Sequence, residues 1–204
     1  MKKGFLGVME MFASFVLLNI MLFFYSLLFV TFIPALAATM EIMHKWKKEG
    51  LTPYFLKSFH SSFKKHAHAT SLLISGIWIA GLVVLALDAW FSATIVMPLS
   101  DVLYVFSVLF FFIWLLMLPY IIVQVMRVDL TIRGVLKNSF FLLWIEWKRT
   151  FLMLLVLILL SVGIMMSPFI LIISGSLFAI SIYSIFLPII STYYLSPKSR
   201  EVYE

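Results

Sequence analysis

Long apolar segments alternate with basic segments along this chain, and that alternation constrains the fold more than any single motif does. Of the 204 residues, 64% are hydrophobic and 12% are charged, whereas a soluble domain is about 45–50% apolar and about 25% charged. A helix needs about 20 apolar residues to cross about 30 Å of hydrocarbon. Five segments are that long: about 11–37, 70–90, 103–126, 150–173 and 176–195. We therefore predict an all-α polytopic membrane protein with five transmembrane helices in a single membrane domain, 1–204.

The first and the last apolar segments each need an interpretation. The first is about twice as long as the apolar core of a signal peptide, so we expect it to be retained as a span. The last, 151–195, is about twice a spanning length and is divided by Ser174, Gly175 and Ser176. We predict two antiparallel helices joined there by a tight turn, with Pro168 allowing a kink. One crossing followed by a re-entrant segment is the alternative.

The basic residues predict how the chain is oriented. Of the 15 lysines and arginines, six lie in segment 38–69, five in segment 127–149 and two in the C-terminal tail, while only Lys2 and Lys3 precede the first span. The positive-inside rule then places both basic segments and the C-terminus in the cytoplasm and the N-terminus outside. Contact with a lipid bilayer that has an anionic inner leaflet accounts for these charges. We expect no nucleic-acid partner.

Each basic segment also contains a helical pattern with an apolar face. The first pattern follows a break at 50–53, and the second lies near the end of segment 127–149. The apolar positions are Phe55, Leu56, Phe59 and Phe63 in the first, and Leu136, Phe140, Leu143, Trp144 and Trp147 in the second. We predict two cytoplasmic amphipathic surface helices that lie on the membrane or dock on a neighbouring helix.

The two halves of the chain share a faint repeat. A span with Pro34, then Leu56, Lys57, Ser58 and Phe59, resembles a span with Pro119, then Leu136, Lys137, Ser139 and Phe140. Parallel repeats of this kind occur in transporters. Because the matched positions are few and their spacings differ, duplication and coincidence both remain open.

Few polar residues in this chain are arranged for chemistry. Asn19 lies in the first span, where an amide must find a partner; we interpret it as an interhelical hydrogen bond, with a cavity or subunit contact as the alternative. His44, His60, His66 and His68 gather in one segment, but no cysteine or carboxylate cluster completes a ligand set, so we interpret them as solvated. We find no HExxH, GxSxG or P-loop motif. We expect no cofactor, no metal and no enzymatic activity.

The first third of the chain resembles a family of small bacterial membrane proteins, the YesL-like family. The positions that carry the resemblance are Leu17, Leu18, Asn19, Ser26, Leu27, Val30, Thr31, Pro34, Ala35, Ala37, Ala38, Phe55, Phe59, Phe63 and Lys64. Leu28 and Ile33 depart from the proline and glycine usual in the family. The resemblance implies a multi-pass protein of the bacterial cytoplasmic (inner) membrane without an established activity, often encoded beside sugar-importing ABC transporters.

Two functions compete at this stage. The first is a non-enzymatic accessory membrane protein associated with a carbohydrate ABC importer, and the second is a small-solute transporter or channel that acts alone or as a homo-oligomer. The sequence does not determine the oligomeric state. Residues expected to make packing or partner contacts are Asn19, Thr31, Pro34, Phe55, Phe59, Phe63 and Phe140.

Overall fold

The described part of the chain consists of helices and the turns that join them. The computed structural model describes residues 2–50, 55–94, 100–127 and 131–193, and no strand occurs among them. The elements in chain order are α1 (Lys2–Ser26), α2 (Phe32–Glu49), α3 (Leu56–His66), α4 (Ala69–Thr94), α5 (Ser100–Leu116), α6 (Leu118–Arg127), α7 (Ile132–Ile145), α8 (Trp147–Met166), the 3₁₀ turn η1 (Pro168–Ile170) and α9 (Leu171–Tyr193).

Five helical segments of the described chain are long and apolar enough to cross a membrane. They are Met9–Ser26, Ala69–Thr94, Ser100–Met126, Trp147–Met166 and Pro168–Phe186. The predicted class, an all-α membrane protein with five transmembrane helices, is therefore confirmed.

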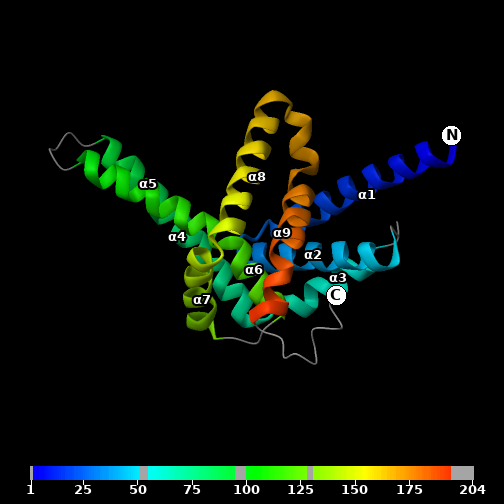
Figure 1. Ribbon diagram of the computed structural model, residues 1–204, viewed down its shortest axis with the longest axis horizontal. Coiled ribbons are helices and arrows are strands. Elements are labelled where there is room, and N and C mark those ends of the chain that lie inside the picture. The colour runs from blue at the N-terminus through cyan, green and yellow to red at the C-terminus, as the bar shows by residue number, and fades with distance from the viewer. Residues whose placement is uncertain (1, 51–54, 95–99, 128–130, 194–204) are drawn as a thin grey trace.

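The spans spread upward from a common base (Figure 1). The α4–α5 hairpin extends to one side, the α8–α9 hairpin stands in the middle and α1 extends to the other side, while α2, α3, α6 and α7 form the base. The N-terminal end of α1, the α8–α9 turn and the facing ends of α4 and α5 lie opposite that base. The elements of both basic segments thus lie at the same end of the spans, as the predicted orientation requires. Which side of the membrane that end faces stays a prediction.

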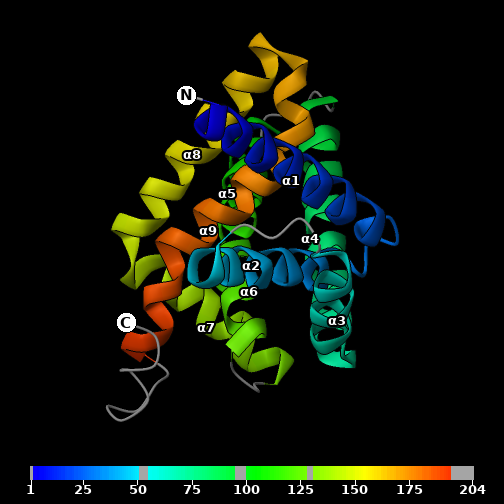
Figure 2. The same ribbon diagram turned by 90° about the vertical axis from the view of Figure 1, so that its right-hand side faces the viewer.

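Helix α2 is the centre of the core. It lies across the base beneath the spans (Figures 1 and 2) and contacts α1, α3, α4, α6 and α9. Its first half is almost wholly buried, including Ile33, residues 35–38 and Met40. The short helix α6 is similarly buried, from Tyr120 to Val123 and beyond. Helix α2 thus lies between the spans and the basic surface, and α6 is the buried end of the third span.

The first span is shorter than predicted. Helix α1 ends at Ser26, and residues 27–31 turn the chain into α2, with Phe29 in the left-handed region at φ 51°. Pro34 therefore lies in the first turn of α2, not near the end of the first span, because a missing N–H costs nothing there. The prediction of one helix over 11–37 is wrong beyond Ser26. The predicted basic segment 38–69 begins inside the buried helix α2.

The predicted turn at Ser174, Gly175 and Ser176 is also wrong. The fourth span ends at Met166, and residues 167–170 make the turn, with Pro168 at the start of η1. Proline supplies this turn because its ring fits the first position of a helical segment and it donates no hydrogen bond. The structure contains two antiparallel helices of spanning length here, α8 and α9 (Figure 1).

The two middle spans differ from the prediction in smaller ways. Helix α4 continues to Thr94, beyond the predicted end of the second span at about residue 90. The third span breaks at Met117, between α5 and α6, with Pro119 in the first turn of α6. The same order of elements therefore occurs twice: a span, a buried helix that begins with a proline in its first turn, an amphipathic helix and a second span.

Candidate functional site

Helix α3 docks on α1 and α2 through its phenylalanine face. Phe59 is fully buried, and its ring centroid lies 5.2 Å from that of Tyr25 at the end of α1. Phe63 contacts the same tyrosine at 4.6 Å, and Phe55 packs edge-on against Trp46 of α2 at 5.1 Å. The three phenylalanines of the predicted apolar face therefore form the docking face, whereas Leu56 is 45% exposed. The neighbour on which they dock belongs to the same chain.

A buried ion pair lies beside this apolar contact. His66 Nε2, at the end of α3, is 2.7 Å from Glu41 Oε2 of α2, and Lys65 Nζ is 3.3 Å from Glu41 Oε1. The His66 side chain is 4% exposed and that of Glu41 is 17% exposed. The hydrogen bond with His66 is the main cause that lowers the pKa of Glu41 from 4.5 to about 2; the charge of Lys65 helps, while burial opposes the shift. The carboxylate thus stays ionised at neutral pH and joins α2 to α3.

Two other histidines form hydrogen bonds with tyrosines. His60 Nδ1 lies 2.6 Å from Tyr25 Oη, and His44 Nδ1 lies 2.7 Å from Tyr183 Oη of α9. The interpretation of these histidines as solvated is wrong for His66, which is buried, because the segment folds back on α2. Within the described ranges, no group of three or more histidine, cysteine or acidic side chains gathers as metal ligands would.

Asn19 marks the point where α1 crosses α9. Its Nδ2 donates hydrogen bonds to the carbonyl oxygens of Leu171 and Ile172, the first bond at 3.2 Å. One turn along α9, Ser176 Oγ donates to the Phe15 carbonyl at 3.0 Å. A Cβ on Gly175 would clash with Asn19 Oδ1. The small residues of α9 that predicted a turn therefore allow a close helix crossing, their usual role between membrane helices.

Thr31 and Pro34 act within the turn between α1 and α2. Thr31 Oγ1 donates a hydrogen bond to the Tyr25 carbonyl, and Pro34 is buried in the first turn of α2. Ser75 Oγ of α4 accepts a hydrogen bond from the Ile33 backbone N–H at 3.1 Å. These hydrogen bonds give polar groups of the turn protein partners where apolar surroundings offer no water.

The second amphipathic helix, α7, buries a different face from the predicted one. Val135, Ser139, Leu142 and Leu143 are buried, and Gln124 Nε2 of α6 donates to Ser139 Oγ at 2.7 Å. Of the predicted face, only Leu143 is buried and Leu136 half-buried. The rest of the predicted face is exposed and aromatic, namely Phe140 and Trp144 of α7 and Trp147 at the start of α8, and the neighbouring Phe141 and Ile145 are exposed too. Phe140 is 42% exposed, whereas Phe59 at the corresponding position of the first repeat is fully buried.

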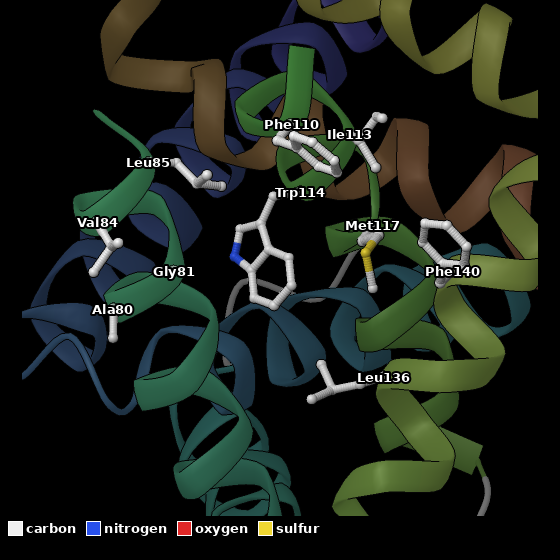
Figure 3. A pocket seen from close by; sticks show the side chains of 10 residues that line it. All are labelled: Ala80, Gly81, Val84, Leu85, Phe110, Ile113, Trp114, Met117, Leu136 and Phe140. Carbon is white, nitrogen blue, oxygen red and sulfur yellow. The ribbon is translucent and has the colours of Figure 1, made fainter. Parts of the chain in front are cut away.

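An apolar groove of about 590 Å³ lies beside this aromatic face, between α4, α5 and α7 (Figure 3). Trp114 of α5 extends into it, with Val84 of α4 on one side and Phe140 of α7 on the other. Trp114 Nε1 donates to the Trp78 carbonyl at 2.8 Å, and Trp78 Nε1 donates to the Trp114 carbonyl at 3.0 Å. This reciprocal pair joins α4 to α5 and satisfies both indoles, because hydrocarbon offers no other partner.

Sequence reasoning missed three groups of residues that build this region. The Glu41–His66 pair spans 25 positions, and the Trp78–Trp114 pair spans 36, so neither has a local signal. Tyr25 lies within an apolar run that resembles any other span. Only the presence of indoles in mid-span, which need a hydrogen-bond acceptor, could have indicated the tryptophan pair.

The comparison with protein families covers one part of this arrangement. Residues 15–89 match the family model described as "Protein of unknown function, DUF624". The match supports a relationship to an uncharacterised domain family over just over a third of the chain. It includes the last 12 residues of α1, all of α2 and α3, and most of α4, which are the helices that meet at Tyr25 and Glu41. No curated protein matches the chain. No solved structure matches it either.

Proposed function

We propose that this chain is a non-enzymatic accessory protein that binds another integral membrane protein along its α4–α5 hairpin. The observation that carries the proposal is that the α4–α5 hairpin diverges from the α8–α9 hairpin (Figure 1) and exposes apolar side chains along its length. Val105, Phe106 and Leu109 of α5 are each more than half exposed, as are Leu87 and Trp90 of α4.

Side-chain hydrogen bonds join the two helices of the hairpin to each other. The reciprocal Trp78–Trp114 hydrogen bonds join its two helices near the base, and Ser107 Oγ donates to Asp88 further out. An arm that is ordered in advance loses little conformational entropy when a partner docks on it. Packing between membrane helices depends on close contact along such surfaces.

The resemblance to the YesL-like family makes a membrane subunit of a carbohydrate ABC importer the first partner to test. A transporter acting alone is the competing proposal. The groove beside α7 supports that competitor poorly, because its walls are apolar side chains and its one polar group, Trp114 Nε1, is already hydrogen-bonded.

Site-specific photo-crosslinking in the native membrane tests the partner surface. A photoreactive phenylalanine analogue is placed at Val105 on the arm or, as the matched control, at Leu159 on α8, whose exposed fractions are 63% and 62%. We expect a discrete adduct with one integral membrane protein from position 105 and none from position 159. Equal adducts from both positions, or adducts with lipid alone, would contradict the proposal.

A flux measurement separates the two functions. The purified chain alone, reconstituted in liposomes, should not move sugars across the bilayer, whereas deletion of its gene should impair import through the crosslinked partner. Solute uptake by liposomes that contain only this chain would favour the solitary transporter instead.

A further inference from the structure

The groove between α4, α5 and α7 has the chemistry of a site for a hydrocarbon chain. Its lining contains Val84, Leu85, Ile113, Met117 and Leu136 together with aromatic rings (Figure 3). Its volume of about 590 Å³ is within the range of small-molecule sites in proteins, about 300–1,000 Å³. A polar solute would lose its hydration there and find no partner, because the Trp114 N–H is already bound to the Trp78 carbonyl.

Two basic residues of α7, Arg133 and Lys137, lie next to the α7 residues that line the groove. Arg133 precedes Leu136 by three residues, and Lys137 precedes Phe140 by three, so the charged and apolar residues share adjacent rows of α7. Both cations are exposed, and no carboxylate among the described residues lies within ion-pairing distance of either. Arg133 is in the first turn of α7, whose N-terminal end lies farthest from the spans (Figure 1), and Lys137 follows one turn later. That end is where a lipid headgroup would sit if its chain entered the groove.

In the first half of the chain, the helix face that corresponds to the aromatic face of α7 is buried. Phe59 of α3 is buried against Tyr25, whereas Phe140 of α7 borders the groove and is 42% exposed. The two amphipathic helices occupy the same place in the repeated order of elements. Helix α7 therefore presents an exposed aromatic surface. On α3 the corresponding surface is covered by Tyr25 of the preceding span, α1.

We propose that this groove binds one anionic phospholipid, with an acyl chain against Trp114 and Phe140 and the phosphate group at Arg133 and Lys137. The apolar walls select for a chain. The two cations select for the negative headgroup: neither has a carboxylate partner among the described residues, and Lys137 Nζ lies 6.0 Å from the centre of the exposed Phe141 ring. A zwitterionic lipid fills the groove equally well but gains less from the cations. This inference is independent of the proposed partner surface, which uses other residues of α5.

Equilibrium binding of phosphatidylglycerol to the full-length, delipidated protein in detergent tests the site. Phosphatidylcholine with the same acyl chains is the headgroup control. Arg133→Gln with Lys137→Gln removes the two cations, and Lys47→Gln with Lys48→Gln removes two exposed cations at the end of α2 as the charge-matched control. Val84→Trp fills the groove, and Leu87→Trp adds the same bulk to an exposed α4 residue outside it.

We expect saturable binding of one phosphatidylglycerol, weakened up to about 25-fold by the Arg133 and Lys137 changes, since each basic residue contributes about fivefold near an anionic headgroup. The Lys47 and Lys48 changes should leave it within about twofold. Val84→Trp should weaken binding of both lipids, and Leu87→Trp neither. Equal affinities for the two lipids, equal losses from the two charge pairs, or no effect of Val84→Trp would each overturn the proposal.

Discussion

Replacing Glu41 by glutamine tests whether the buried ion pair holds α3 on α2. The substitution keeps the shape of the side chain and removes the charge that His66 and Lys65 contact at 2.7 and 3.3 Å. The pKa of Glu41 falls from 4.5 to about 2 on folding, chiefly through the hydrogen bond with His66. At about 1.4 kcal/mol per pH unit this difference corresponds to about 3 kcal/mol as an upper bound. Lys65 is 63% exposed and adds little, so we expect a loss of about 2 kcal/mol at pH 7.

The pH dependence gives this prediction a second readout. The pKa of Glu41 is lower in the folded protein than in the unfolded one. Its contribution to the free energy of unfolding is therefore fully present well above pH 4.5 and decreases as the pH falls from about 5 toward 2. The difference in thermal stability between the wild type and Glu41→Gln, measured in detergent, should therefore shrink by about 1 kcal/mol between pH 7 and pH 4. Glu10→Gln, which removes an exposed glutamate of α1, is the control and should change neither value.

A local measurement shows whether α3 is the element released. The chain contains no cysteine, so Ser62→Cys places a single thiol on the buried face of α3, where Ser62 is 2% exposed, and Ser61→Cys places one on the exposed face. In the Glu41→Gln background, the thiol at position 62 should become reactive while the thiol at position 61 reacts as before. An unchanged position 62, or pH profiles that run parallel in the two proteins, would refute the reasoning.

Three further predictions follow from the helix contacts and the orientation. Asn19→Leu should lower stability by about 1–2 kcal/mol in thermal unfolding, because it removes hydrogen bonds from α1 to α9; unchanged stability would mean that the bonds are unimportant. Gly81→Ala should lower the free energy of unfolding by about 1–3 kcal/mol, since a Cβ would lie 2.6 Å from the Trp114 ring. A melting temperature equal to that of the wild type would contradict that contact. An impermeant thiol reagent applied to intact cells should label Met165→Cys, which is 85% exposed at the α8–α9 turn, but not Ser61→Cys; labelling of position 61 would reverse the orientation.

Hydropathy predicted the number of spans because five apolar segments exceed the length that the bilayer requires. It misplaced their ends because apolar residues continue through the turns. Residues 27–31 contain no glycine, and Phe29 itself adopts the left-handed conformation there, at a cost of about 1–2 kcal/mol that composition does not reveal. The position of Pro34 was the available signal, because a proline marks the first turn of a helix more often than its interior.

Small residues were misleading at the other end of the chain. Glycine and serine mark turns in soluble proteins, and that rule placed a turn at Ser174–Ser176. Inside a membrane the same residues let two backbones approach, because hydrocarbon supplies no hydrophobic force between helices and close contact must replace it. Gly175 has that role against Asn19. Of the candidate contacts, the phenylalanine periodicity of α3 located a buried face, whereas His66 could not be placed because its partner lies on a different helix.

The position of α2 explains why the sequence divided it between the first predicted span and a basic segment. Its first half, with Pro34 and residues 35–38, is as apolar as a span and fills the core. Its second half carries Glu41 and three lysines, yet Trp46 and Met43 there are buried too. The helix thus lies where the apolar base meets the basic surface, and its carboxylate joins that surface to α3. A change in the first half should therefore disturb the packing of the spans, while a change at Glu41 should first release α3 and leave the spans in place.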